Sequence, residues 1–173
     1  PRSLQAEGAE DSFIRTLSQV QDDLRRDYVT GAYNAVYLNE QYRPIAERAA
    51  MSGTPVGVVM VRVNEYWQLR EHESDSAANC CLNMAAGILQ LAVGPDHDKA
   101  VLARLNDGFF AIVTIGTPAA RMAQTVREAM NDSRREFNIS LSRRGSFTVE
   151  IASAEWGETA SWDMTLSLAQ QRL

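Results

Sequence analysis

Two apolar runs joined by a short polar turn, at residues 100–116, place the tightest limit on what this chain can fold into. The first run begins at Ala100 and the second begins at Phe109, with Asn106, Asp107 and Gly108 between them. Asn, Asp and Gly tolerate the positive φ angles that short hairpin turns require. Residues 100–116 are therefore predicted to form a β-hairpin, and the open question is whether its turn has a chemical role.

Further elements follow from the periodicity of the apolar residues. The nearly continuous apolar run at residues 54–63 is rich in β-branched residues and predicts a central strand covered on both faces. Helices are predicted over residues 11–26, 34–50, 77–91, 117–130 and 159–173, and Pro44 is expected to kink the second of them. A second hairpin is predicted at residues 137–153, turning near Gly145. This interleaving indicates one α/β (α+β) domain with a mixed sheet.

The helix predicted at residues 11–26 carries one narrow apolar seam. Phe13, Leu17, Val20 and Leu24 follow one another at spacings of four, three and four residues. This spacing is typical of a helix that pairs with another in a coiled coil. It also suits a helix that packs on its own domain, and the sequence leaves the two interpretations open.

Charge and composition exclude several classes of function. The chain has 17 basic and 22 acidic residues, a net charge of −5 without long charged runs, which argues against a nucleic-acid partner. No apolar run reaches the ~20 residues of a membrane span, and no signal peptide is recognised. We therefore expect a cytoplasmic location, either free or as the cytoplasmic part of a larger membrane-anchored protein.

Two cysteines and two histidines are further candidates for chemistry. Cys80 and Cys81 are adjacent within a predicted helix, a poor arrangement for a disulfide, and are interpreted as buried thiols in a reducing compartment. His72 and His97 lie among acidic residues, but neither has a second histidine at ligand spacing. Solvated surface is therefore the preferred interpretation, and no metal site is predicted.

Several motifs resemble those of the GGDEF (diguanylate cyclase) family. Residues 27–34, "DYVTGAYN", match the family's opening "DxxTGxxN" box, and residues 103–110, "ARLNDGFF", fall on its "ARxGGDEF" signature. The tail "DMTLSLAQQ" resembles its closing "DxALYxAKxxG". The resemblance covers residues 27–173 and implies the palm-like fold of nucleotidyl cyclases, a mixed central sheet flanked by helices. Residues 1–26 are then a helical linker or stalk.

The resemblance also implies where the family's metal ligands would lie. Its enzymes use bound divalent metal to neutralise triphosphate oxygens and to help activate a ribose hydroxyl. The two metal carboxylates fall on Arg62 and Gly108, and the acid at the fourth place of the signature falls on Phe109. Hard cations need oxygen ligands, which none of these side chains supplies. We therefore expect no catalytic residue, no metal and no cofactor.

Guanine and phosphate recognition depart from the family pattern as well. The Asn and Asp that hold the base fall on Arg70 and Asn79, and the two glycines of the turn fall on Asn106 and Asp107. The charge of Asp107 would repel phosphate. The family's phosphate-binding Lys and its "RxxD" product-inhibition pair fall on Gln170, His97 and Ala100. The degenerate signature turn is therefore Asn106, Asp107, Gly108, Phe109 and Phe110, and the vestigial nucleotide pocket comprises Arg62, Arg70, Asn79, Asn106 and Asp107.

These departures predict a catalytically inactive GGDEF-like regulatory module in a cyclic di-GMP-related bacterial signalling protein. It would act through protein contacts, as a homodimer through the N-terminal helix or with an active cyclase or an attached sensor or effector domain. One alternative is a non-catalytic receptor for GTP or a cyclic dinucleotide, since arginine is well suited to grip phosphate. Another is an enzyme with a different chemistry. The opposing expectation is that Arg62 and Arg70 only pair with Asp107, Glu71 or Glu73, and Arg62 in particular with the hairpin tip beside Asp107.

Overall fold

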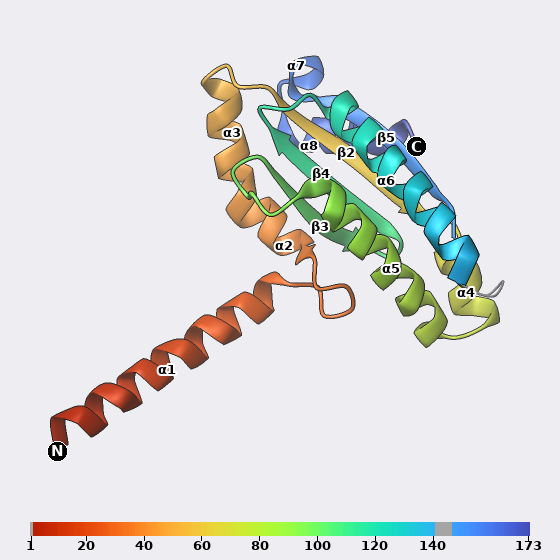
Figure 1. The fold of residues 1–173 in the computed structure, drawn as a ribbon. Helices are drawn as coiled ribbons and strands as arrows, with labels where there is room; N and C mark the ends of the chain where they lie inside the picture. Colours follow the sequence, from red (N-terminus) through yellow and green to blue (C-terminus); the bar gives the residue numbers. More distant parts are fainter. Residues whose placement is uncertain (1, 141–146) are drawn as a thin grey trace.

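A mixed five-stranded sheet forms the centre of the protein (Figure 1). The computed structural model describes residues 2–140 and 147–173, with side chains described for residues 8–133 and 147–173. The strands are β1 (Tyr33–Asn34), β2 (Val56–Val63), β3 (Ala100–Asn106), β4 (Phe109–Ile115) and β5 (Val149–Glu155), in the order β1-β3-β4-β2-β5. β1 is parallel to β3, and all other neighbours are antiparallel. The mixed sheet and the hairpin at residues 100–116 are confirmed.

The strand β2 is buried on both faces, as its continuous apolar run predicts. Val59 and Val61 face one core with the helices α5 (Asp75–Val93) and α6 (Ala119–Ser140). Val58 and Met60 face the opposite core with the helices α3 (Arg43–Met51) and α8 (Trp162–Gln171). All four are at most 1% exposed. Alternate residues of one strand therefore serve two different hydrophobic layers.

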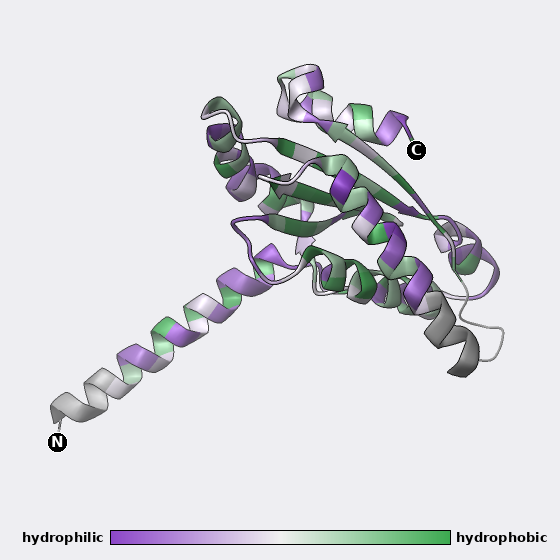
Figure 2. Cartoon of the chain, turned by 45° about the horizontal axis from the view of Figure 1, so that its top comes forward, coloured by the Kyte–Doolittle hydropathy of each residue, from purple (hydrophilic) through white to green (hydrophobic). Residues whose placement is uncertain are grey.

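The hydropathy of the helices agrees with this layered arrangement (Figure 2). Among the described helices, α5 is the one long and apolar enough by length and composition to span a membrane. Its apolar side chains, such as Leu82, Ala85 and Leu89, are fully buried against the sheet. The apolar character of α5 is therefore explained by its place in the core. Two short helices, α4 (Tyr66–His72) and α7 (Trp156–Thr159), complete the body.

The segment predicted as one kinked helix at residues 34–50 contains a π-helical turn. It begins as α2 (Ala35–Tyr37), widens over Leu38–Tyr42 and continues as α3. The backbone N–H of Arg43 donates to the carbonyl of Leu38, five residues earlier. Pro44 directly follows, and it has no N–H to continue a regular helical ladder. The widened turn places Leu38, Tyr42 and Ala46 on the buried face.

The first strand of the predicted second hairpin is wrong where the structure describes it. Residues 137–140 continue α6, which ends at Ser140, and residues 141–146 lie outside the described part of the chain. Extending an existing helix gains a hydrogen bond for each added residue, which outweighs the alternating pattern of this short segment. The second strand is confirmed, because β5 pairs with β2 in the antiparallel sense.

The helix α1 (Arg2–Arg25) extends away from the body (Figure 1). The seam residues are solvent-exposed, with Phe13 at 65%, Leu17 at 47% and Leu24 at 71%. The interpretation that this seam packs on its own domain is therefore wrong. The coiled-coil interpretation stays a prediction.

The motif at residues 27–34 holds the end of α1 to the body. The side-chain amide of Asn34 donates to the carbonyl of Leu24 (2.7 Å), while its oxygen accepts from the backbone N–H of Tyr37 (2.8 Å). Asp27 Oδ2 accepts from both the N–H and the hydroxyl of Thr30 at 3.0 and 2.7 Å. Asp27 Oδ1 accepts from Arg104 Nη1 of β3 at 3.2 Å. One short motif thus joins α1, α2 and the hairpin.

The start of α6 packs so closely on β2 that Gly57 has no room for a side chain. A Cβ at this position would lie 2.5 Å from Ala119 Cβ and 2.9 Å from Ala119 N. Gly57→Ala should therefore lower the free energy of unfolding by about 1–3 kcal/mol in urea denaturation. Gly87→Ala is the control, because Gly87 lies in α5 and a Cβ added there would meet no atom within 4 Å. That change should stabilise by roughly 0.5–1 kcal/mol, and equal effects at both sites would contradict this packing.

Candidate functional site

The hairpin turn between β3 and β4 is held from within the hairpin. Asp107 adopts a left-handed conformation with φ of 47°. Its backbone carbonyl accepts from Arg104 Nε at 3.0 Å, and the strand register shifts between Arg104 and Asn106. Because Arg104 also bonds Asp27, with both side chains only 13–14% exposed, the turn and the segment that follows α1 share one largely buried guanidinium. The turn is therefore a fixed part of the framework.

Gly108, on which the resemblance places a metal carboxylate, is enclosed by neighbouring atoms. A Cβ built on it would lie 2.9 Å from Tyr66 Cβ and 3.0 Å from the carbonyl oxygen of Val63. The carbonyl of Gly108 accepts from the N–H of Val63 at 2.8 Å, so the backbone cannot easily move away. The structure thus leaves no room here for an acidic side chain without rearrangement.

Arg62, at the place of the other metal carboxylate, forms an ion pair with Glu150 of β5. Its Nε also donates to Asn64 Oδ1 at 3.3 Å. The expected pairing of Arg62 with Asp107 is wrong. Arg62 and Glu150 are directly opposite in the β2–β5 ladder, whereas the cross-strand neighbour of Arg62 on β4 is Phe109. The side chain therefore finds its carboxylate on the strand at the edge of the sheet.

Arg70 is also engaged, although with none of the expected partners. Arg70 Nε lies 3.3 Å from Asp75 Oδ1, at the start of α5. Its Nη1 donates to the Tyr66 hydroxyl at 3.4 Å, and its guanidinium lies 5.4 Å from the centre of the Trp67 ring. The pairing with Asp107, Glu71 or Glu73 is therefore wrong. Tyr66 connects Arg70 to the hairpin turn, because it contacts Gly108 as well.

The remaining predicted site residues differ widely in exposure. Asn79 is half-buried near the start of α5 and, within the described part of the chain, its side chain has no hydrogen-bond partner. Asn106 is exposed at the end of β3, and Gln170 is exposed on α8. Phe109 is half-buried and Phe110 is fully buried in the core.

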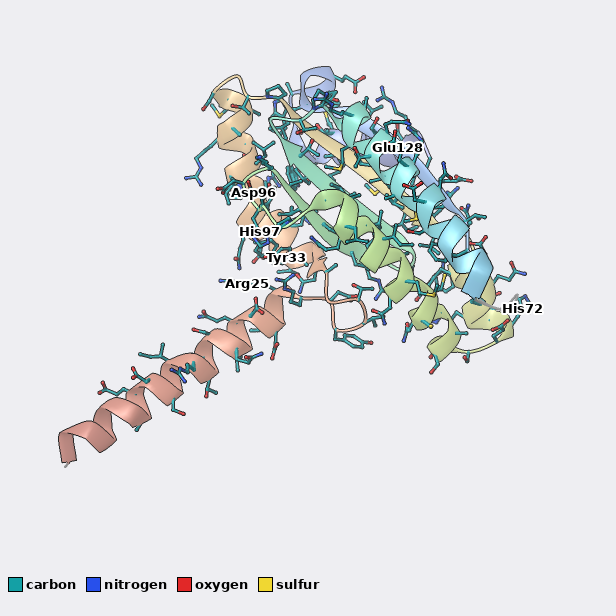
Figure 3. The ribbon with its side chains drawn as sticks, viewed as in Figure 1. Arg25, Tyr33, His72, Asp96, His97 and Glu128 are labelled. Carbon is teal, nitrogen blue, oxygen red and sulfur yellow. The ribbon has the colours of Figure 1, made fainter. Side chains whose placement is uncertain are left out.

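The two histidines lie at opposite ends of the body (Figure 3). The Tyr33 hydroxyl lies 3.2 Å from His97 Nδ1, and the two rings meet edge to face at 5.4 Å. Tyr33 in turn lies between the Tyr37 ring, stacked at 3.9 Å, and the guanidinium of Arg26 at 4.0 Å. Within the described residues, no group of three or more His, Cys, Asp or Glu side chains could hold a metal ion.

Two important neighbours were missed by sequence reasoning. Glu150 follows the segment predicted to turn, 88 residues from Arg62, and no local pattern links the two. Tyr66 lies between the strand predicted at residues 54–63 and the helix predicted at residues 77–91, so its place beside the turn had no signal in the sequence. Both depend on which elements become neighbours in the fold: two strands for Glu150, and α4 and the hairpin for Tyr66.

Restoring a carboxylate at the turn should destabilise the domain. Gly108→Asp should lower the free energy of unfolding by about 1–3 kcal/mol, because its Cβ would overlap Tyr66 and the Val63 carbonyl. Asp107→Gly is the matched control, because glycine accepts the positive φ at that position, and stability should change by less than about 0.5 kcal/mol. Urea denaturation measures both. A fully stable Gly108→Asp variant would contradict the steric argument.

The adjacent cysteines should differ in reactivity. Cys81 is buried, and burial raises the pKa of its thiol to about 12. Cys80 is exposed. The expectation of a buried thiol is therefore confirmed for Cys81 and wrong for Cys80. One thiol per chain should react with a thiol-exchange reagent in the native state, and two should react in denaturant. Cys80→Ser should abolish the native reaction. Rapid modification of Cys81 in the folded variant would show that the helix opens.

Comparison with known proteins agrees with this fold. Residues 24–173 match the family described as diguanylate cyclase, GGDEF domain. The coiled coil and GGDEF domain of DgcB from Caulobacter crescentus, in complex with c-di-GMP, superposes with a TM-score of 0.83 at 18% identity, covering 98% of this chain and 89% of that one. The FimX GGDEF domain from Pseudomonas aeruginosa gives 0.68 at 23% identity, covering 86% and 90%.

A third relative extends beyond the length of this chain. The diguanylate cyclase SiaD of Pseudomonas aeruginosa, in complex with its activator SiaC, gives a TM-score of 0.72 at 19% identity. The match covers 99% of this chain and 65% of SiaD. At these identities the superpositions establish the fold, and the family match establishes the relationship: the chain belongs to the GGDEF family.

Proposed function

We propose that this GGDEF domain is catalytically silent and acts in cyclic di-GMP signalling through protein contacts. The observation that carries the proposal is the state of the two positions at which the family places metal carboxylates. Arg62 presents a guanidinium that is paired with Glu150, and Gly108 presents no side chain. A divalent cation needs oxygen ligands, so these residues do not fit the metal that the family implies.

The surroundings of these positions support the proposal further. An enzyme that transfers a phosphoryl-type group by positioning its substrate must hold the contacts to the metal, to the guanine base and to the phosphates in place together. Arg70 is held by Asp75 and Tyr66 in place of the family's base-binding amide. Asp107 brings a carboxylate to the turn where phosphate would approach, which is electrostatically unfavourable.

The nucleotide-receptor alternative requires Arg62 and Arg70 to leave their present partners. Each already neutralises a carboxylate, so phosphate binding would have to replace an existing ion pair. A ligand that binds the folded state raises the melting temperature. Melting curves with GTP, GDP, ATP and cyclic dinucleotides should coincide with the curve of the domain alone. A reproducible rise for one of them, lost in Arg70→Gln, would establish the receptor alternative.

The domain should form no cyclic di-GMP from GTP with Mg²⁺ or Mn²⁺. Product would be followed by chromatography beside a buffer blank and an active GGDEF cyclase. Arg62→Asp should restore nothing, because Gly108 still lacks a carboxylate and the new acid would face Glu150. Turnover above the blank that disappears when residues 106–109 are replaced would refute the proposal.

The exposed seam of α1 is the surface that we propose for association between chains. Phe13, Leu17, Val20 and Leu24 are 47–71% exposed on one helix. Apolar side chains at this spacing gain stability when a second helix covers them. The DgcB structure described above contains a coiled coil beside its GGDEF domain, and SiaD is bound to an activator protein. These relatives support a role for the stalk in binding a partner.

Leu17→Asp should weaken this association. Sedimentation equilibrium of the chain should detect a dimer at high concentration, and a charge in the seam should shift it to monomer by at least about tenfold in dissociation constant. Ser18→Asp is the control, because Ser18 lies outside the seam on the same helix. A strict monomer for both the parent and Leu17→Asp would exclude pairing through this seam.

A further inference from the structure

The outer edge of β5 is directed away from the rest of the sheet. β5 pairs with β2 alone and ends the strand order. The N–H of Asn64 donates to the carbonyl of Thr148 at 3.0 Å, just before the ladder begins. Bonded and non-bonded pairs alternate in an antiparallel ladder, so the backbone groups of Ile151 and Ser153 point outward from β2.

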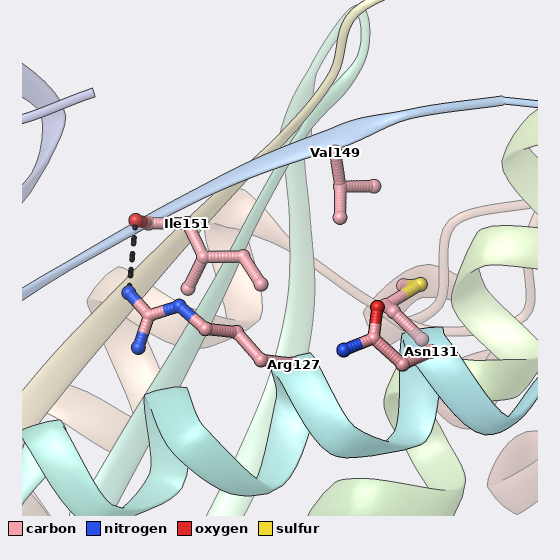
Figure 4. A pocket seen from close by; sticks show the side chains of 5 residues that line it. Arg127, Asn131, Val149 and Ile151 are labelled. Atoms are coloured by element: carbon pink, nitrogen blue, oxygen red, sulfur yellow. Dashed lines mark hydrogen bonds between the residues drawn. The ribbon is translucent and has the colours of Figure 1, made fainter.

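Two arginine side chains donate hydrogen bonds to the outward-facing carbonyls of this edge. Arg127 of α6 donates through Nη2 to the Ile151 carbonyl at 3.5 Å (Figure 4). Arg172, directly after α8, donates through Nη1 to the Ser153 carbonyl at 2.8 Å. Across the described ranges, no acceptor meets the N–H of Ile151 or of Ser153. The edge therefore presents hydrogen-bond donors, two from the backbone and more from the guanidinium groups.

A hollow of about 220 Å³ lies between α6 and this edge strand (Figure 4). Met130, Val149 and Ile151 give it apolar walls, and Arg127 and Asn131 bring polar groups. The hollow lies directly beside the outward backbone groups of Ile151. A side chain carried by a strand at this edge would therefore have a place to pack.

The charges at the edge favour a particular occupant. Arg172 is neutralised by Glu158, with nitrogen–oxygen distances of 2.9 and 3.0 Å. In residues 8–133 and 147–173, no carboxylate lies within 4 Å of the Arg127 guanidinium. Pairing β5 with its own copy would bring two Arg127 side chains near one another and is unfavourable. An acidic strand would satisfy both the cation and the free amides.

We propose that the β5 edge binds an extended acidic segment of a partner protein, which adds to the sheet as a further strand. Its carbonyls would accept from Ile151 and Ser153, a carboxylate would pair with Arg127, and an apolar side chain would enter the hollow. The β5 edge and its acidic partner are distinct from the seam of α1 and the helix proposed to cover it. It does not depend on catalytic silence, because the edge is separate from the hairpin turn.

The test uses a fluorescent six-residue peptide of alternating glutamate and valine, with blocked ends, titrated with the full chain by anisotropy. The peptide should bind, and the matching lysine–valine peptide should bind at least about tenfold more weakly. Ser153→Pro removes the outward N–H without removing a ladder bond and should weaken binding of the acidic peptide about tenfold. Ser153→Ala keeps that N–H and should bind like the parent chain.

Arg127→Gln provides a second arm that does not alter the strand backbone. It should weaken binding of the acidic peptide about fivefold and reduce the preference over the lysine peptide. Circular dichroism tests whether each variant is folded. If Ser153→Pro is unfolded, the binding of Arg127→Gln and the comparison of the two peptides test the proposal instead. Equal affinity for the two peptides, parent-like binding by Ser153→Pro, or no binding up to about 1 mM peptide would overturn the proposal.

Discussion

The two-sided burial of β2 is the constraint on which the rest of the structure depends. Its alternate side chains enter two separate cores, so helices must cover both faces of the sheet. Its two edges are also occupied, by β4 and by β5. Once this strand is central, the hairpin must lie on one side and the last strand on the other. The end of β2 then brings Arg62 between Phe109 and Glu150.

This placement separates the packing of the sheet from the residues at the strand ends. The core residues of β2 and β4 are fully buried, and their packing does not depend on a metal at the strand ends. At those ends, Arg62 and Gly108 have structural neighbours of their own. Arg62 joins two strands, and Gly108 admits Tyr66 against the turn. The end of β2 is thus a place where the sheet, the hairpin and α4 are held together.

The sequence was sufficient to predict the elements that repeat a local pattern. The central strand, the hairpin at residues 100–116 and the apolar seam of α1 follow from the spacing of apolar residues and turn formers, whereas the exposure of that seam was left open by the sequence. Local pattern failed at residues 137–140, where continuation of α6 outweighed an alternating segment. It also failed for the partners of Arg62 and Arg70, because ion pairs depend on which elements become neighbours. The exposure of Cys80 beside buried Cys81 reflects its place on the outer side of α5.

The side chain of Asn34 fastens the last turn of α1 and the first turn of α2 with its two ends. This double attachment sets the direction in which α1 leaves the body. A helix of 24 residues is roughly 36 Å long. A change of about 10° in its direction at this attachment would therefore move its far end by about 6 Å. The same residues 27–34 reach the hairpin through Asp27 and Arg104. A small change in the contacts of Asp27 and Arg104 at the hairpin turn would thus correspond to a large displacement at the far end of α1.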